Sequence, residues 1–99
     1  MAAYILADVS VHDAEAYREY TSQVPATLAP FQGRFVVRAG AYETLEGEWS
    51  PDRVVLIEFP TAELARAWYA SPAYRAILPI RQRNSEATFL ALIEGVSNS

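Results

Sequence analysis

Four extended segments that are apolar on both faces constrain this chain more than any other feature of its sequence. They are AYILADVSV (3–11), RFVVRAGAYETL (34–45), RVVLIEF (53–59) and SEATFLALIEG (85–95). Their β-branched and aromatic residues favour strands. A strand with one face in water alternates apolar and polar residues, but the runs YILA, VVLI and FLALI do not. We therefore expect a sheet whose two faces are both covered.

A helical segment follows the first strand. Asp13 is placed to cap it, since an aspartate carboxylate accepts from free N–H groups in the first turn. Tyr17 and Tyr20 lie at helical spacing and give the segment one apolar face. Pro25 and Pro30 should break it into a turn or a second short helical piece, because proline removes a backbone donor.

A second helical segment follows the third strand. Thr61 is placed to cap it, and Ser71-Pro72 predicts a stop and a restart, because proline is tolerated at the first helical position. The restarted helix should run to about Arg83, with a distortion at Pro79.

The resulting order, β-α-β-β-α-β, predicts a ferredoxin-like α+β fold in one domain spanning residues 1–99. The loop EGEWSPD (46–52) should join the two middle strands into an antiparallel hairpin. The sheet is then four-stranded and antiparallel, with the helices on one face. The other face would expose several hundred Å² of hydrocarbon. We therefore expect a homodimer, with two sheets packed face to face as a dimeric α/β barrel. A monomer with scattered exposed apolar residues is the alternative.

The composition excludes several classes of site. There is no Cys, so thiolate chemistry and Cys-ligated zinc are excluded. A net charge of −4 without a basic run argues against nucleic acid as a partner. No apolar stretch reaches the ~20 residues of a membrane span, and the N-terminus lacks a basic region typical of a signal peptide. We expect a cytoplasmic protein.

No cofactor is predicted. Neither G-x-G-x-x-G nor a P-loop occurs, and no nucleophile elbow is present. The single imidazole, His12, falls between a strand end and a helix cap and has no metal-motif spacing. We expect an exposed or capping role for it.

Nearly the whole chain, residues 3–95, resembles a bacterial family known as domain of unknown function thirteen-thirty. The resembling pieces are DAEAYREY (13–20), GRFVVRAG (33–40), LEGEW (45–49), RVVLIEFP (53–60) and AWYASPAYRAI (67–77), with Arg81 beyond them. The resemblance implies a dimeric α/β barrel and little chemistry, since the family has no settled activity. The chain departs from the pattern at Gln32 and Ala39, where a second Gly is common, and at Pro79.

Three polar residues, Asp8, Arg38 and Glu58, lie inside predicted strands, where burial is costly unless they are paired. If residue 40 pairs with residue 56, Arg38 and Glu58 are cross-strand neighbours, but a slip of one residue separates them. Such a pair would orient a small polar or anionic ligand, or form a structural ion pair at the dimer seam or sheet edge. Asp8 would be a general base in a partly apolar pocket, made more basic by desolvation; alternatively, it would lie at a sheet edge or pair with an arginine.

Further candidates come from the helices. Tyr17 and Tyr74 could present hydroxyls to a cavity between helix and sheet, and Arg81, seven residues beyond Tyr74, would share its helix face. Alternatively, the tyrosine rings pack and Arg81 pairs with a surface carboxylate. Trp68 is expected in the core.

Two functions fit these residues. The first is a small-molecule pocket in each subunit, with a cofactor-independent enzyme transferring protons on a small polar or anionic metabolite. The second is a non-catalytic ligand-binding or dimerisation module. An enclosed cavity of about 300 Å³ or more touching several candidates would favour the first function, and solid packing between helices and sheet would rule the first function out.

Overall fold

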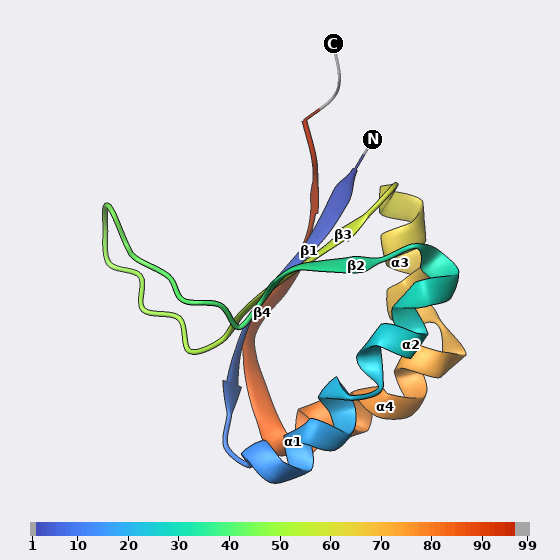
Figure 1. Ribbon diagram of the computed structural model, residues 1–99, viewed down its shortest axis with the longest axis horizontal. Helices are drawn as coiled ribbons and strands as arrows, with labels where there is room; N and C mark the ends of the chain where they lie inside the picture. Colours follow the sequence, from blue (N-terminus) through green and yellow to red (C-terminus); the bar gives the residue numbers. More distant parts are fainter. Residues whose placement is uncertain (1, 97–99) are drawn as a thin grey trace.

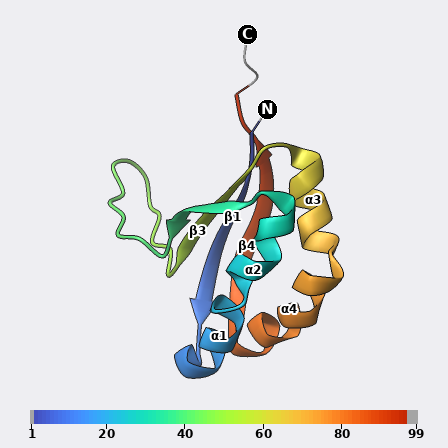
Figure 2. The same ribbon diagram turned by 45° about the vertical axis from the view of Figure 1, so that its right-hand side comes forward.

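A four-stranded antiparallel sheet forms one layer of the computed structural model, which describes residues 2–96 (Figure 1). The strands are β1 (Ala3–Val11), β2 (Arg34–Arg38), β3 (Val54–Phe59) and β4 (Ser85–Glu94), in the order β2-β3-β1-β4. The second layer consists of α1 (Ala14–Thr21), α2 (Val24–Leu28), the 3₁₀ turn η1 (Ala29–Phe31), α3 (Ala62–Ala70) and α4 (Pro72–Asn84). The helices cover one face of the sheet (Figure 2), which confirms the predicted ferredoxin-like order.

The helix boundaries follow the local sequence. The Asp13 carboxylate accepts a hydrogen bond from the Ala16 N–H at 3.1 Å, and the Thr61 hydroxyl accepts one from the Leu64 N–H at 3.1 Å. The Ser71 hydroxyl caps α4 in the same way. Each cap satisfies a donor that the first helical turn leaves free. The predicted caps at Asp13 and Thr61 and the predicted restart at Ser71-Pro72 are confirmed, and α4 continues through Pro79.

The core lies between the helices and the inner face of the sheet. Trp68 is 1% exposed, and its ring centroid lies 4.2 Å from that of Tyr74. The Trp68 indole N–H donates to the Thr27 hydroxyl at 3.0 Å, so its one polar atom is satisfied. Phe59 packs on the same indole at 5.6 Å. The predicted core role of Trp68 is confirmed.

The prediction that the second strand reaches Leu45 is wrong, because β2 ends at Arg38. Its pairing with β3 shifts between Phe35 and Val37, and Ala39 then takes a left-handed φ of 57°. A bulge bends a strand, and a left-handed residue turns it out of the ladder. Residues 39–53, here called the arm, therefore leave the sheet and project away from the helices (Figure 1).

Two residues where the family pattern commonly has Gly adopt the conformation that glycine favours. Gln32 closes η1 with a φ of 60°, and Ala39 has a φ of 57°. Gly33, beside Gln32, is required for another reason. A Cβ there would lie 2.7 Å from the Phe59 ring and 2.8 Å from Leu28. The turn after η1 thus combines a left-handed Gln32 with a Gly33 that has no room for a side chain.

The outer face of the sheet has no cover among the described residues. Tyr4 and Leu6 of β1 and Leu56 of β3 are only partly buried, and they alternate with core residues along their strands. The exposed large hydrophobic residues lie on β2, the arm, β4 and the segment after it, and none lies on a helix: Val36, Tyr42, Leu45, Trp49, Phe89, Ile93 and Val96. Within residues 2–96, exposed hydrocarbon is therefore gathered on the side away from the helices.

Candidate functional site

A narrow cavity of about 40 Å³ lies between the helices and the inner face of the sheet. Its apolar wall includes Ile5 and Ala7 of β1, Val55 of β3 and Leu90 of β4. Its polar lining comprises Tyr17, Tyr20, Thr21, Arg38, Arg53 and Arg81. The space suffices for roughly three water molecules. It is far smaller than the ~300 Å³ expected for a metabolite pocket, so any ligand seated there without rearrangement must be small.

Three arginines converge on this cavity, and no carboxylate or imidazole lines it. Arg81 comes from α4 and is 7% exposed, Arg53 is partly buried at the end of the arm, and Arg38 at the end of β2 is exposed. Between residues 2 and 96 the one ion pair joins Arg34 to Glu58, well away from the cavity lining. The three guanidinium groups therefore face the cavity without a carboxylate partner.

Arg81 is the most deeply placed of the three. Its Nε–H has no hydrogen-bond partner in the described part of the chain. Burial acts to lower the pKa of Arg81, but tyrosine hydroxyls, led by that of Tyr74, outweigh burial and hold the pKa above its ordinary value. Arg81 thus stays positively charged in a largely apolar surrounding, which is unfavourable without a counter-charge.

The two other arginines are held by contacts at the edge of the cavity. The Arg38 guanidinium lies 4.3 Å from the Phe35 ring centroid, and its Nη2 donates to the Thr21 carbonyl at 2.7 Å. The Arg53 guanidinium lies 5.5 Å from the Tyr17 ring centroid. Both distances are within the range of cation–π attraction. These contacts hold Arg38 and Arg53 beside the cavity, and they occupy some of the groups that could otherwise bind a ligand.

Two tyrosines of α1 form the helical side of the cavity. The Tyr20 hydroxyl lies 2.8 Å from that of Tyr74, and the Tyr17 and Tyr20 ring centroids are 5.3 Å apart. Burial raises the pKa of Tyr17, against the opposing pull of the nearby arginines, and it also raises the pKa of Tyr20. Both hydroxyls are therefore neutral at physiological pH, and Tyr17 can donate a hydrogen bond into the cavity.

The structure brings together three of the six predicted site residues: Tyr17, Arg38 and Arg81 all line the cavity. Tyr74 is fully buried behind the cavity, where its hydroxyl lies beside two lining residues, Tyr20 and Arg81. Their role in binding stays a prediction.

Asp8 and Glu58 do not line the cavity. The register sets Arg34 opposite Glu58 and Arg38 opposite Val55, so the pairing that would make Arg38 and Glu58 neighbours does not occur. Glu58 instead pairs with Arg34 and accepts from the Tyr4 hydroxyl at 3.3 Å.

Asp8 holds the base of the arm. Its Oδ1 accepts from the backbone N–H groups of Asp52 at 3.1 Å and Arg53 at 3.3 Å, and Ser10 donates to the Asp52 carboxylate. These bonds give the Asp8 carboxylate a structural task at the end of the arm that carries Arg53.

Sequence reasoning did not place Arg53 in the site. Little in the sequence indicated a role for Arg53, since a charged residue at the start of a strand is usually exposed to solvent. Only the tertiary structure shows that the end of the arm brings this residue against Tyr17.

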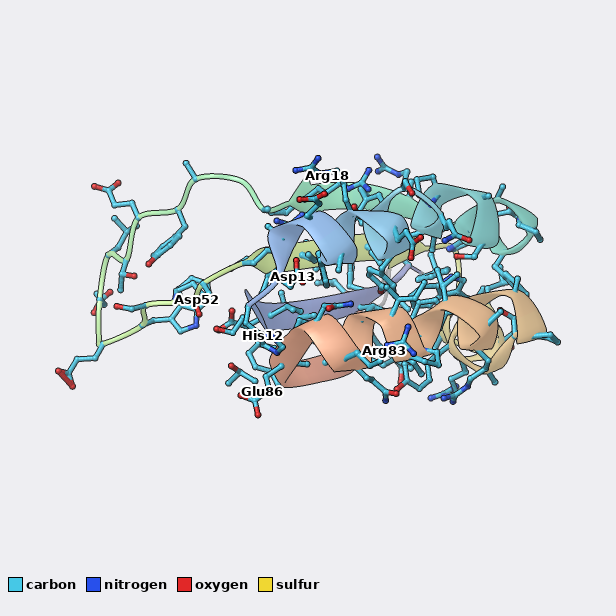
Figure 3. All side chains as sticks on the ribbon, turned by 90° about the horizontal axis from the view of Figure 1, so that it is seen from below. His12, Asp13, Arg18, Asp52, Arg83 and Glu86 are labelled. Atoms are coloured by element: carbon cyan, nitrogen blue, oxygen red, sulfur yellow. The ribbon has the colours of Figure 1, made fainter. Side chains whose placement is uncertain are left out.

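At the end of the domain where β1 passes into α1, His12 and Asp13 do not line the cavity. Figure 3 looks onto this end and shows His12 and Asp13 there, with Arg18, Asp52, Arg83 and Glu86. His12 is exposed, as predicted. Across residues 2–96, no group of three or more His, Asp or Glu side chains could hold a metal ion.

The model of one protein family, Domain of unknown function (DUF1330), matches residues 2–96. The chain belongs to this family. A search of curated proteins finds no match. In the part of the chain that the structure describes, no helix has the length and apolar character needed to cross a membrane. The cytoplasmic location stays a prediction.

Solved structures share the fold at low sequence identity. The protein of unknown function RPA0582 from Rhodopseudomonas palustris is 20% identical, with a TM-score of 0.72 over 98% of this chain and 84% of that one. SnoaB from Streptomyces nogalater, a cofactor-independent oxygenase, is 16% identical with a TM-score of 0.66, over 98% and 95% of the two chains. HapK from Hahella chejuensis is 16% identical with a TM-score of 0.67 over the same shares. These likenesses show the ferredoxin-like fold alone.

Proposed function

We propose that the protein binds a small polar or anionic molecule in the cavity between its helices and its sheet. One observation carries this proposal. Tyr17, Arg38 and Arg81, which come from α1, β2 and α4, converge on one otherwise apolar cavity. A few polar groups that meet in an apolar hollow are the usual form of a small-molecule site.

Catalysis by proton transfer without a cofactor is the first function we propose for this cavity. A cluster of guanidinium groups favours negative charge on a bound molecule, so it would stabilise an enolate or phenolate that forms there. Tyr17, neutral at physiological pH, would donate a hydrogen bond to the same oxygen. SnoaB, a cofactor-independent oxygenase, has the same fold, which supports the proposal by analogy only.

Ligand binding without turnover is the second candidate, and a specific observation favours it. No Asp, Glu or His lines the cavity, so its lining supplies no ordinary general base. A substrate would therefore have to be acidic enough to transfer its proton to water. A protein that only binds its ligand needs no proton transfer.

A screen of small carboxylates, phenols and lactones by thermal shift, followed by mass analysis of each binding compound, tests the proposal. We expect binders that raise the melting temperature of the wild type and lose affinity in Arg38→Gln, with the fold retained. Arg66→Gln, an exposed arginine on α3 outside the cavity lining, is the matched control and should bind normally. Conversion of a bound compound would establish catalysis. Binding without conversion would support the second candidate, a ligand-binding protein without turnover. If no compound binds, the proposal is wrong.

We also propose that the protein is a homodimer whose outer sheet faces pack together, and dimerisation would then be part of its function. The support is the partly buried row of Tyr4, Leu6 and Leu56, together with the exposed hydrophobic residues around it. Burying several hundred Å² of such surface would contribute on the order of 10 kcal/mol before the cost of association. An interface between identical faces is also the commonest kind of oligomer.

A further inference from the structure

We propose that the ligand of this cavity is a small monocarboxylate whose negative charge is held by Arg81. This inference rests on the function proposed above and narrows it to one chemical class. Three features of the cavity carry it: an unpaired buried cation, a shortage of hydrogen-bond donors other than arginine, and a small apolar volume.

The first feature is the charge of Arg81. The groups that face it are the tyrosines of α1, α3 and α4 and the arginines at the ends of β2 and of the arm. None of them is an acid. A buried guanidinium is stable when it is paired with an anion and fully hydrogen-bonded, and here the Nε–H has no partner. An anion brought by the ligand would supply the missing charge and acceptors.

The second feature sets the kind of anion. Arg38 and Arg53 are already engaged with Thr21 and with aromatic rings, whereas Arg81 is buried beside tyrosine hydroxyls and its Nε–H has no partner in the described part of the chain. The Tyr20 hydroxyl is paired with Tyr74, and most of the remaining lining is aliphatic. Two carboxylate oxygens match the planar fork of one guanidinium. A phosphate carries a higher charge, which one buried guanidinium would leave partly unbalanced in an apolar cavity.

The third feature sets the size. A cavity of about 40 Å³ admits a carboxylate with a short hydrocarbon chain, and not a drug-sized molecule. The chain of such a ligand would lie on Ile5, Val55 and Leu90, which form the sheet side of the cavity. The apolar wall and the buried charge of Arg81 together favour an acid of a few carbon atoms.

Titration of the isotope-labelled protein with propionate, propionamide and inorganic phosphate, followed by amide NMR, tests this inference. We expect propionate to shift the resonances of cavity residues with millimolar affinity, and the neutral amide and phosphate to bind at least about tenfold more weakly. Arg81→Met should lose propionate binding, while Arg83→Met, an exposed arginine on the same helix, should keep it.

Thermal unfolding of the same variants separates a ligand anchor from a structural residue. A buried charge without an ionic partner can be replaced by an apolar residue of similar volume with no loss of stability. Arg81→Met should therefore melt at or above the wild-type temperature while it fails to bind propionate. Propionate binding that survives this substitution, or tighter binding of phosphate, would overturn the inference.

The inference and the proposed function fail in different ways. If propionamide binds in the cavity as tightly as propionate, the pocket stands and the carboxylate assignment is wrong. If neither these probes nor any compound of the wider screen perturbs the cavity residues, both are wrong. If Arg81→Met unfolds the protein, Arg81 is structural, and the inference is overturned as well.

Discussion

The two faces of the sheet carry similar residues but have different surroundings. Ile5 of β1 pairs with Ile57 of β3 on the inner face, and each is 4% exposed beneath the helices. The next pair along the same strands, Leu6 with Leu56, points outward and is only partly buried. The two tryptophans repeat the contrast, since Trp68 is 1% exposed in the core and Trp49 is 45% exposed on the arm. The comparison teaches that hydrophobic sequence alone does not say what will cover a strand.

The largest expected loss of stability comes from a substitution on the inner face of the sheet. Trp68→Ala should lower the free energy of unfolding by ~3–5 kcal/mol, because it opens a cavity between Phe59 and Tyr74 and removes the bond to Thr27. Trp49→Ala on the arm is the matched control and should cost less than ~1 kcal/mol. Denaturant unfolding followed by circular dichroism measures both. Equal losses would remove the distinction between the two regions.

A charge on the outer face should have the next largest effect, which is a loss of association free energy. This effect is expected only if two outer faces pack together in a dimer. Leu56→Glu should convert the proposed dimer into monomers, with a loss of ~2–4 kcal/mol in association free energy, because it buries an unpaired carboxylate in the seam. Light scattering after size exclusion gives the mass of each variant. Glu63→Gln, an exposed change on α3, is the control and should leave the mass unchanged. A Leu56→Glu variant with the mass of the wild type would show that this face is not an interface.

The join between the sheet and the arm should respond less strongly. Asp8→Ala removes the acceptor for the Asp52 and Arg53 N–H groups, so we expect a loss of ~1–3 kcal/mol. Hydrogen exchange should quicken at those two amides and across residues 39–53, while the core strands stay protected. Unchanged exchange in the arm would mean that Asp8 does not hold it.

The smallest effect concerns Tyr20 and depends on pH. Tyr20→Phe should cost ~1 kcal/mol at pH 7, since it removes the hydroxyl bond to Tyr74. Burial raises the pKa of Tyr20 above its ordinary value of 10.0, so the unfolded chain ionises first. The contribution of the Tyr20 hydroxyl is therefore full below pH 10 and is lost as the pH rises further. Unfolding measured from pH 7 to 11 should show a steeper decline for the wild type than for Tyr20→Phe, and parallel curves would contradict this explanation.

Local features of the fold could be predicted from sequence, and features that depend on distant residues could not. Asp13, Thr61 and Ser71 cap helices as expected because a cap needs only the next three residues. The end of β2 was missed because the bulge before Val37 depends on pairing with β3. The Arg34–Glu58 pairing precedes this shift, and the shift then sets Arg38 opposite Val55, where Arg38 lines the cavity.

The positions of some cavity-lining residues could also be predicted, while their role in binding stays a prediction. Tyr17 and Arg81 were found because helical spacing fixes which face of a helix they share with core residues. Asp8 was misplaced because its acceptor role depends on where the arm returns to the sheet. The volume of the cavity could not be predicted, since it is set by how Trp68 and its neighbours fill the space beneath the sheet.

The mass of the wild-type protein in solution at micromolar concentration tests most directly whether the bare side of the sheet is covered by a second copy. Sedimentation equilibrium should return about twice the subunit mass of 11.0 kDa. A single species at the subunit mass would contradict the account, because the hydrocarbon on that side would then face water.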